Sequence, residues 1–115
     1  MFISEPDVLE KLRADVTERY AEDFEIYKSC NTLLEMLAKN TTKGTAVSEF
    51  YNIYPGIKIY AAGDYENDLE MLMAADKAVC PSNALEMVKA KCDIVLCDHD
   101  KGAIADLIEK IEKGF

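Results

Sequence analysis

The segment from Gly63 to Leu72, GDYENDLEML, carries three residues whose types and spacing could bind a metal ion and a phosphate. They are Asp64, Asn67 and Asp68, and they follow an apolar run that is typical of a buried strand. Parallel α/β sheets bind their ligands where such strands end and a helix begins. Two carboxylates and one amide oxygen facing one cavity form an all-oxygen site suited to Mg²⁺, and the helix N-terminus offers N–H groups to a phosphate. Spacing alone also fits acids that simply offset the helix dipole.

A second segment, TTKGT at residues 41–45, places a lysine at the predicted start of a helix. A cation there opposes the helix dipole and is mildly unfavourable. Lys43 is better explained if it faces an anion, either Asp68 or a phosphoryl group of a substrate. A solvated surface lysine is the alternative that the residue type leaves open.

From residue 42 onward, the spacing of apolar residues predicts helices that alternate with short strands. The predicted strands are residues 57–62, 78–80 and 93–97, and Ser82 is predicted to cap the helix between the last two. Strands that alternate with helices indicate a parallel sheet with right-handed crossovers. Three strands are few for a free-standing sheet, so we expect this unit to be half of a larger one.

The first 38 residues follow a different pattern. Ser4, Pro6 and Asp7 are typical of a helix start, and four apolar residues then recur on one predicted helical face: Val8, Leu12, Val16 and Tyr20. Two β-like runs, residues 24–27 and 32–37, lie on either side of Asn31 and predict an antiparallel hairpin. A helix followed by a hairpin favours an α+β layer, with a boundary near residues 38–40.

Composition excludes several classes of function. The chain has 115 residues, 22 acidic against 13 basic, and a formal net charge of −9, which disfavours nucleic acid as a partner. A small phosphorylated metabolite stays compatible, because a metal ion and one lysine can reverse the local field. No apolar run approaches the ~20 residues that span a bilayer, and no signal peptide is recognisable, so we expect a cytoplasmic protein without a membrane partner. The four cysteines show no zinc-ligand or CxxC spacing and are expected to be reduced thiols.

Several motifs occur in a familiar order: KGTA at 43–46, the strand 57–62, GDYEND at 63–68, CPSNA at 80–84, and DIV at 93–95 followed by Gly102. With this order the chain resembles the C-terminal part of Cof-like, subfamily IIB phosphatases of the haloacid-dehalogenase (HAD) superfamily, over residues 1–115. The resemblance implies an α/β fold, in which a partial Rossmann-like core with parallel strands is preceded by the end of an α+β cap domain. It places the C-terminal part of the cap at residues 1–38 and the C-terminal half of the core at residues 39–115.

The resemblance also implies an activity and a set of site residues. The activity is Mg²⁺-dependent hydrolysis of a small phosphate ester of the sugar-phosphate type, through an aspartyl-phosphate. Lys43, Asp64 and Asp68 match catalytic residues of the family, and Lys43 and Asn67 match residues that contact the phosphate. Asp64 matches the principal Mg²⁺ ligand, and Asp68 the second acid, which supports the metal and pairs with the lysine.

The family's nucleophile motif, an apolar strand leading into Asp-x-Asp-Gly-Thr, has no good match among these residues. We therefore expect a fragment that is inactive alone and that either self-associates or pairs with the N-terminal half of the core. The segment DIVLCDHDKG at 93–102 is superficially similar to the motif and would make Asp98 the nucleophile of a circularly permuted enzyme. The extra Lys101 and the missing threonine argue against this, and His99 is better explained as a solvated loop residue.

Two further alternatives come from other classes of protein. The chain could be a non-catalytic remnant that binds a metal or a partner chain. It could also be an unrelated receiver-like module with Asp64 as the phosphate acceptor. The receiver alternative needs an acidic pair at the end of an early strand, and residues 1–30 supply none.

Overall fold

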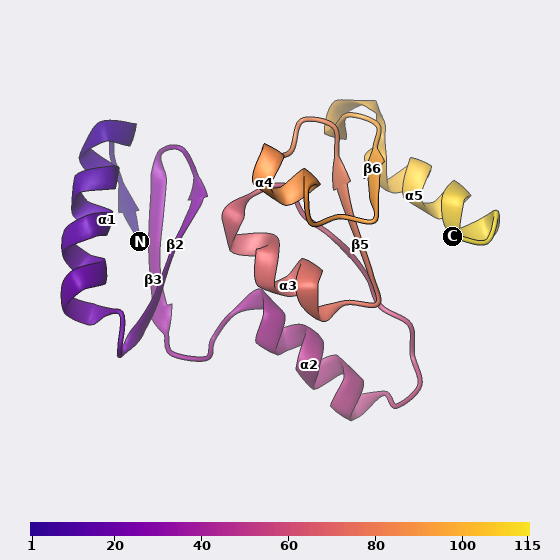
Figure 1. The fold of residues 1–115 in the computed structure, drawn as a ribbon, viewed down its shortest axis with the longest axis horizontal. Coiled ribbons are helices and arrows are strands. Elements are labelled where there is room, and N and C mark those ends of the chain that lie inside the picture. Colours follow the sequence, from indigo (N-terminus) through magenta and orange to yellow (C-terminus); the bar gives the residue numbers. More distant parts are fainter.

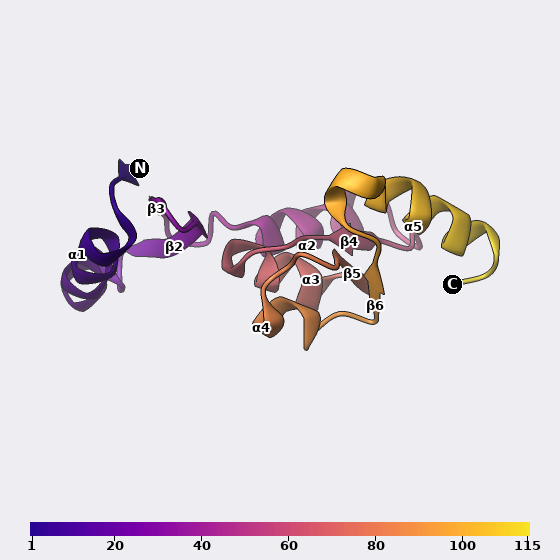
Figure 2. The same ribbon diagram turned by 90° about the horizontal axis from the view of Figure 1, so that it is seen from above.

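Two separate three-stranded sheets organise the chain, one in each of two lobes (Figure 1). The computed structural model describes residues 1–115 and measures 47 × 33 × 19 Å. We call residues 1–38 the N-terminal lobe and residues 39–115 the C-terminal lobe. The long axis of the molecule runs through both lobes, with the two termini far apart (Figure 2).

The N-terminal lobe is an antiparallel sheet with one helix against it. It contains β1 (Phe2–Ile3), α1 (Pro6–Tyr20), β2 (Phe24–Cys30) and β3 (Leu33–Ala38), and the strand order is β1-β3-β2. The register of β2 and β3 runs from the pair Phe24–Ala38 to the pair Cys30–Leu33. The predicted hairpin is therefore confirmed, with a longer first strand than the sequence indicated.

Helix α1 differs from its prediction in its cap and in its buried face. Pro6 is its first residue, as expected, but Glu5 and not Ser4 is the N-cap. Val16 is buried as predicted and Leu12 packs beside it, but the third contact with Leu34 of β3 comes from buried Leu9, whereas Val8 is 53% exposed. The sequence offers an apolar residue at both positions 8 and 9, and spacings of three and four residues are both helical, so periodicity could not choose between the two faces.

The C-terminal lobe alternates helices with parallel strands, and it confirms the predicted fold class. Its strands are β4 (Tyr60–Ala62), β5 (Lys77–Pro81) and β6 (Ile94–Leu96), in the order β4-β5-β6. Its helices are α2 (Lys43–Ile53), α3 (Leu69–Ala74), α4 (Glu86–Lys89) and α5 (Ala103–Glu112), with short 3-10 turns η1 (Glu66–Asp68) and η2 (His99–Lys101).

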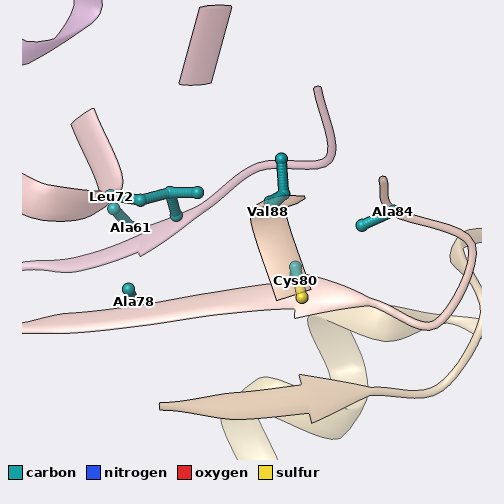
Figure 3. Close-up of a cluster of buried hydrophobic side chains, with 6 residues drawn as sticks. All are labelled: Ala61, Leu72, Ala78, Cys80, Ala84 and Val88. Atoms are coloured by element: carbon teal, nitrogen blue, oxygen red, sulfur yellow. The ribbon is translucent and has the colours of Figure 1, made fainter. Parts of the chain in front are cut away.

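Both faces of the parallel sheet are covered by helices. Alternate residues of a strand point to opposite faces, so β5 contributes side chains to a cluster on each face. On one face, Ala78 and Cys80 of β5 join a cluster with residues of β4, α3, α4 and the turn before α4 (Figure 3): Ala61, Leu72, Ala84 and Val88. On the other face, Val79 packs with Leu96 and with two residues of α5, Ala103 and Leu107. This arrangement fixes the ends of β4 and β5, where the acidic segment begins.

Two local predictions in this lobe are wrong or incomplete, the length of the first strand and the cap of α4. The regular part of the predicted strand 57–62 is only Tyr60–Ala62, and Ile57 is 39% exposed. Strand β4 pairs with β5 alone, so its other edge is open, as expected for half of a larger sheet. Ser82 does not cap α4, whose N-cap is Leu85.

Other expectations concern the cysteines and the membrane. All four cysteines are free, and only Cys80 is buried. None of the helices has the length and apolar character needed to cross a bilayer.

Candidate functional site

The carboxylate of Asp68 lies at the centre of the candidate site, in a residue that is 4% exposed. Its Oδ1 accepts a hydrogen bond from Nζ of Lys43. Its Oδ2 accepts hydrogen bonds from the backbone N–H groups of Asp64, at 3.0 Å, and Tyr65, at 3.3 Å. Burying a carboxylate is costly unless donors satisfy it, and here one ammonium and two N–H groups do so. Asp68 therefore links helix α2 to the loop that follows β4.

Gly63 makes room for this carboxylate. A Cβ atom at position 63 would lie 2.4 Å from the Cβ of Asp68 and 2.8 Å from its Oδ2. These distances are far below the van der Waals contact of two such atoms, so a side chain at this position would displace Asp68 from its donors.

Lys43 reaches Asp68 because the start of α2 is fixed in place. Thr42 and Thr45 cap the helix reciprocally. The Thr42 hydroxyl accepts from the Thr45 N–H at 3.1 Å, and the Thr45 hydroxyl accepts from the Thr42 N–H at 3.0 Å. Gly44 then allows α2 to approach α3, since a Cβ there would lie 2.8 Å from that of Glu70. One of the two anions expected to face Lys43 is thus observed, while half of the lysine side chain, 51%, stays exposed.

Asp64 lies directly beyond β4 and is exposed, and no residue of the chain donates a hydrogen bond to its carboxylate. Its backbone carbonyl accepts from the Leu85 N–H at 3.0 Å, which fixes the loop. The residue lines a cavity of about 290 Å³ between the strand ends and the start of α5, together with Ala62, Gly63, Pro81, Leu96, His99, Gly102, Ala103 and Ile104. A carboxylate with this exposure is available to a ligand from solvent.

Asn67 lines a different and smaller cavity, of about 50 Å³, at the junction of the two lobes. Lys43 and Thr42 line it from the same lobe, and the hairpin of the N-terminal lobe contributes Tyr27, Glu35 and Leu37. Lys43 and Asn67, the two residues expected to contact a phosphate, are therefore brought together.

The expectation that Asp64, Asn67 and Asp68 face one cavity is wrong. Asp64 faces the larger cavity, Asn67 faces the smaller one, and Asp68 lines neither. The physical reason is that Asp68 turns inward to satisfy the loop's own N–H groups and Lys43. The buried carboxylate nevertheless contacts one residue of each cavity, the ammonium of Lys43 at the smaller one and the backbone N–H of Asp64 at the larger one.

Sequence reasoning missed the hairpin residues of the smaller cavity. The phenol of Tyr27 donates to Oε1 of Glu70 at 2.8 Å, and burial, together with that carboxylate, raises the pKa of Tyr27 above its usual value. Glu35 accepts from the Ser29 hydroxyl at 2.7 Å. No local motif marks these residues, because their position depends on how the hairpin lies against the other lobe.

The alternative site around Asp98 has the geometry of a cap. Its Oδ1 accepts from the Asp100 N–H at 3.1 Å at the start of η2. The ring nitrogens of His99 lie 3.2 and 3.0 Å from the carboxylates of Asp98 and Asp100, and the histidine side chain is 60% exposed. His99 is exposed, as expected, but it lies in η2 and lines the larger cavity together with Asp64.

Comparison with known proteins establishes the family. The family model described as haloacid dehalogenase-like hydrolase matches residues 1–108. The chain belongs to this family. Its parallel sheet and the position of its acidic loop, directly after β4, are those that the sequence predicted.

Three known proteins illustrate the similarity of this HAD-like hydrolase chain. It is 33% identical over 85 residues to 5-amino-6-(5-phospho-D-ribitylamino)uracil phosphatase YwtE of Bacillus subtilis, covering 71% of this chain and 29% of that protein. It is 32% identical over 121 residues to the chloroplastic endoribonuclease YBEY of Arabidopsis thaliana, covering 92% of this chain and 20% of that protein. The structure of the HAD subclass IIB sugar phosphatase BT4131 matches with a TM-score of 0.79 at 27% identity, over 90% of this chain and 40% of that chain. The chain thus spans less than half of each of these proteins.

We expect Asp68→Asn to lower the free energy of unfolding by about 1–3 kcal/mol, the usual cost of leaving buried polar groups unpaired. An amide cannot accept on both sides, so either Lys43 or the two backbone N–H groups lose their acceptor. Asp64→Asn is the matched control and should change the free energy of unfolding by less than about 0.5 kcal/mol, because no side-chain hydrogen bond is lost. Denaturant unfolding followed by circular dichroism, with a metal chelator present, measures both. Equal losses in the two variants would contradict the central role of Asp68.

Proposed function

We propose that the chain supplies the metal- and phosphate-binding part of a Mg²⁺-dependent phosphatase that hydrolyses a small phosphate ester of the sugar-phosphate type. The observation that carries the proposal is the double role of Asp68, which holds both the ammonium of Lys43 and the backbone of the loop that bears Asp64. Phosphoryl transfer depends on positioning and charge stabilisation, and this carboxylate keeps a cation and an anionic loop in a fixed relation. Membership of the family supports the same reaction.

In this proposal, residues 1–38 are the C-terminal part of a cap domain and residues 39–115 are the C-terminal half of a Rossmann-like core. The change from an antiparallel to a parallel sheet between β3 and β4 supports the division. The smaller cavity is lined by residues of both parts, so a substrate bound there would contact the cap and the core at once.

The residues near the end of β4 fit Mg²⁺, because they offer carboxylate oxygens, the ligands that this ion prefers. Asp64 would bind the ion directly with its free carboxylate. A carboxylate has about four lone-pair sites, and hydrogen bonds use three of those of Asp68, one on Oδ1 and two on Oδ2, which leaves about one on Oδ1. Direct contact between Asp68 and the ion therefore stays a prediction, and its support of the Asp64 loop is the role that its contacts favour. When bound, Mg²⁺ offsets negative charge on the phosphoryl oxygens.

Lys43 and Asn67 are the proposed phosphate ligands. An ammonium group has three N–H donors, and Asp68 uses one of those of Lys43, so the others can donate to a phosphoryl oxygen in the smaller cavity. Asn67 adds amide donors to the same cavity. The reaction of the family needs a nucleophilic aspartate, and we assign this group to a segment outside the 115 residues.

The hairpin wall of the smaller cavity supports a hydroxyl-bearing leaving group. Glu35 and Tyr27 line it, and a carboxylate accepts hydrogen bonds from hydroxyl groups while it repels a second anion. A phosphate ester whose leaving group is an uncharged sugar or polyol matches this wall better than an ester whose leaving group carries its own carboxylate.

We expect Mg²⁺ to bind weakly and to shift the backbone amide signals of residues 63–68 in ¹⁵N NMR spectra at millimolar concentration. Asp64→Asn should abolish these shifts. With Mg²⁺ present, inorganic phosphate should shift the signals of residues 42–45 and 67, and Lys43→Ala should remove that response while Lys91→Ala, an exposed lysine on the same lobe, leaves it unchanged. Submillimolar Mg²⁺ affinity that persists in Asp64→Asn, or shifts centred on residues 98–100, would show that the metal site has been misassigned.

The 115-residue chain alone should show no Mg²⁺-dependent hydrolysis of p-nitrophenyl phosphate, because it has no matched nucleophile. The loss of a nucleophile removes covalent catalysis altogether. Release of p-nitrophenol, followed by absorbance, is the measurement. Turnover that survives repurification and disappears in Asp98→Asn would favour the circularly permuted alternative.

The open edge of β4 lies beside exposed apolar residues, and we propose that another segment covers them. Strand β4 pairs on one side only, and Ile104, at the start of α5, lines the larger cavity with Ala62 of β4 while remaining 59% exposed. Unpaired strand edges and apolar surface favour association. The proposed partner is the N-terminal half of the core or, when the chain is alone, a second copy of it.

Sedimentation equilibrium at micromolar concentration should therefore give a mass above that of one chain. Ile104→Glu should shift the equilibrium toward the monomer, because it places a charge on the apolar surface beside β4. Val8→Glu, at a similarly exposed residue of the N-terminal lobe, is the control and should leave the mass unchanged. A strictly monomeric and cooperatively folded wild type would contradict the proposal.

A further inference from the structure

Glu66 lies inside the acidic loop, between Asp64 and Asn67, but its side chain is bonded to the other lobe. Nη1 of Arg13, on α1, lies 3.1 Å from each of its carboxylate oxygens. The backbone N–H of Lys28, on β2, donates to its Oε1 at 2.6 Å. The side chain of Glu66 is only 17% exposed, so these contacts are shielded from solvent on most sides.

Lys28, whose backbone N–H donates to Glu66, is itself held by a neighbouring element. Lys28 and Asp68 are the two buried charged residues of the chain, at 7% and 4% exposure. The Lys28 ammonium is held by Glu10 of α1 at 2.6 Å, which joins β2 to α1. Glu66 therefore connects with a strand of the N-terminal lobe that is bonded to α1.

Two more hydrogen bonds cross between the lobes at the same segment. The Tyr65 phenol donates to Oδ1 of Asn31 at 2.7 Å, and the Tyr27 phenol donates to Oε1 of Glu70 at 2.8 Å. On the side of the C-terminal lobe, all of these contacts come from residues 65–70, which also contain Asn67 and Asp68. The N-terminal lobe is thus attached to the segment that carries the proposed phosphate and metal ligands.

We propose that Glu66 is a positioning residue, through which Arg13 and Lys28 of the N-terminal lobe set the conformation of the acidic loop. The inference rests on the proposed function of that loop. Because coupling between two linked equilibria is reciprocal, a ligand on the loop also stabilises the observed arrangement of the lobes. Docking of the N-terminal lobe and ligand binding are one coupled process in this chain.

The test compares Glu66→Ala, Glu66→Gln and Arg13→Ala with the wild-type chain. Arg19→Ala is the matched control, since Arg19 lies on the same helix but pairs only with Asp15 in an exposed ion pair. Mg²⁺ affinity is measured by ¹⁵N NMR from the amide shifts of residues 63–68. Residual dipolar couplings measured in the same samples show whether both lobes share one alignment.

Glu66→Ala should weaken Mg²⁺ binding by about 5-fold or more, the lower end of typical coupling between linked sites, and should give the two lobes separate alignments. Glu66→Gln should recover part of the affinity, because its amide oxygen still accepts from the Lys28 N–H. Arg13→Ala should have an intermediate effect, and Arg19→Ala none. A purely structural role for Glu66 would lower stability without changing the affinity of the folded chain.

If the wild type binds Mg²⁺ and Glu66→Ala binds it equally well, the inference fails while the proposed function stands. If the wild type binds neither Mg²⁺ nor phosphate, the proposed function and the inference both fail. Should Glu66→Ala not fold, as judged by circular dichroism, Glu66→Gln and Arg13→Ala carry the test, and unchanged affinity in both would overturn the inference.

Discussion

The buried carboxylate of Asp68 is the constraint on which the site depends. It is stable only because Lys43 and the N–H groups of Asp64 and Tyr65 donate hydrogen bonds to it. Removing any of these donors would leave part of a buried charge unpaired, which lowers stability. The neighbouring sequence serves this requirement. Gly63 leaves the space that the carboxylate fills, and Gly44 lets α2 come close enough to α3 for Lys43 to reach it.

This constraint also explains why the acids of one short segment have different roles. Asp68 is used internally, so the carboxylate that remains open to solvent is that of Asp64. The chain has a net charge of −9, and the buried carboxylate of Asp68 keeps the cation of Lys43 beside the acidic loop. The residues proposed to bind phosphate, Lys43 and Asn67, line the smaller cavity, and the free carboxylate of Asp64 lies at the larger one.

The sequence predicted what depends on local pattern. The hairpin, the α/β alternation and the contact between Lys43 and Asp68 follow from spacing, from the turn at Asn31 and from the cost of an unpaired cation at a helix start. The buried face of α1 was predicted in part, since Val16 is buried, but Leu9 was missed because Val8 and Leu9 both fit helical periodicity. The length of β4 was overestimated because the whole apolar run 57–62 was interpreted as a buried strand. Strand β4 has one neighbour only, and Ile57 is exposed. Nothing local could predict that Glu66 meets Arg13, 53 residues earlier.

The geometry of η1 shows how one short turn serves two lobes. A 3-10 helix has about three residues per turn, so successive side chains point about 120° apart. Glu66, Asn67 and Asp68 make up that turn, and they point to the N-terminal lobe, to the smaller cavity and to Lys43, respectively. An α-helix would set successive side chains about 100° apart, so the 3-10 turn separates the three neighbours slightly more evenly. Because one backbone turn carries all three residues, a rotation of the backbone at Glu66 would also turn Asn67, and the buried hydrogen bonds of Asp68 oppose such a rotation.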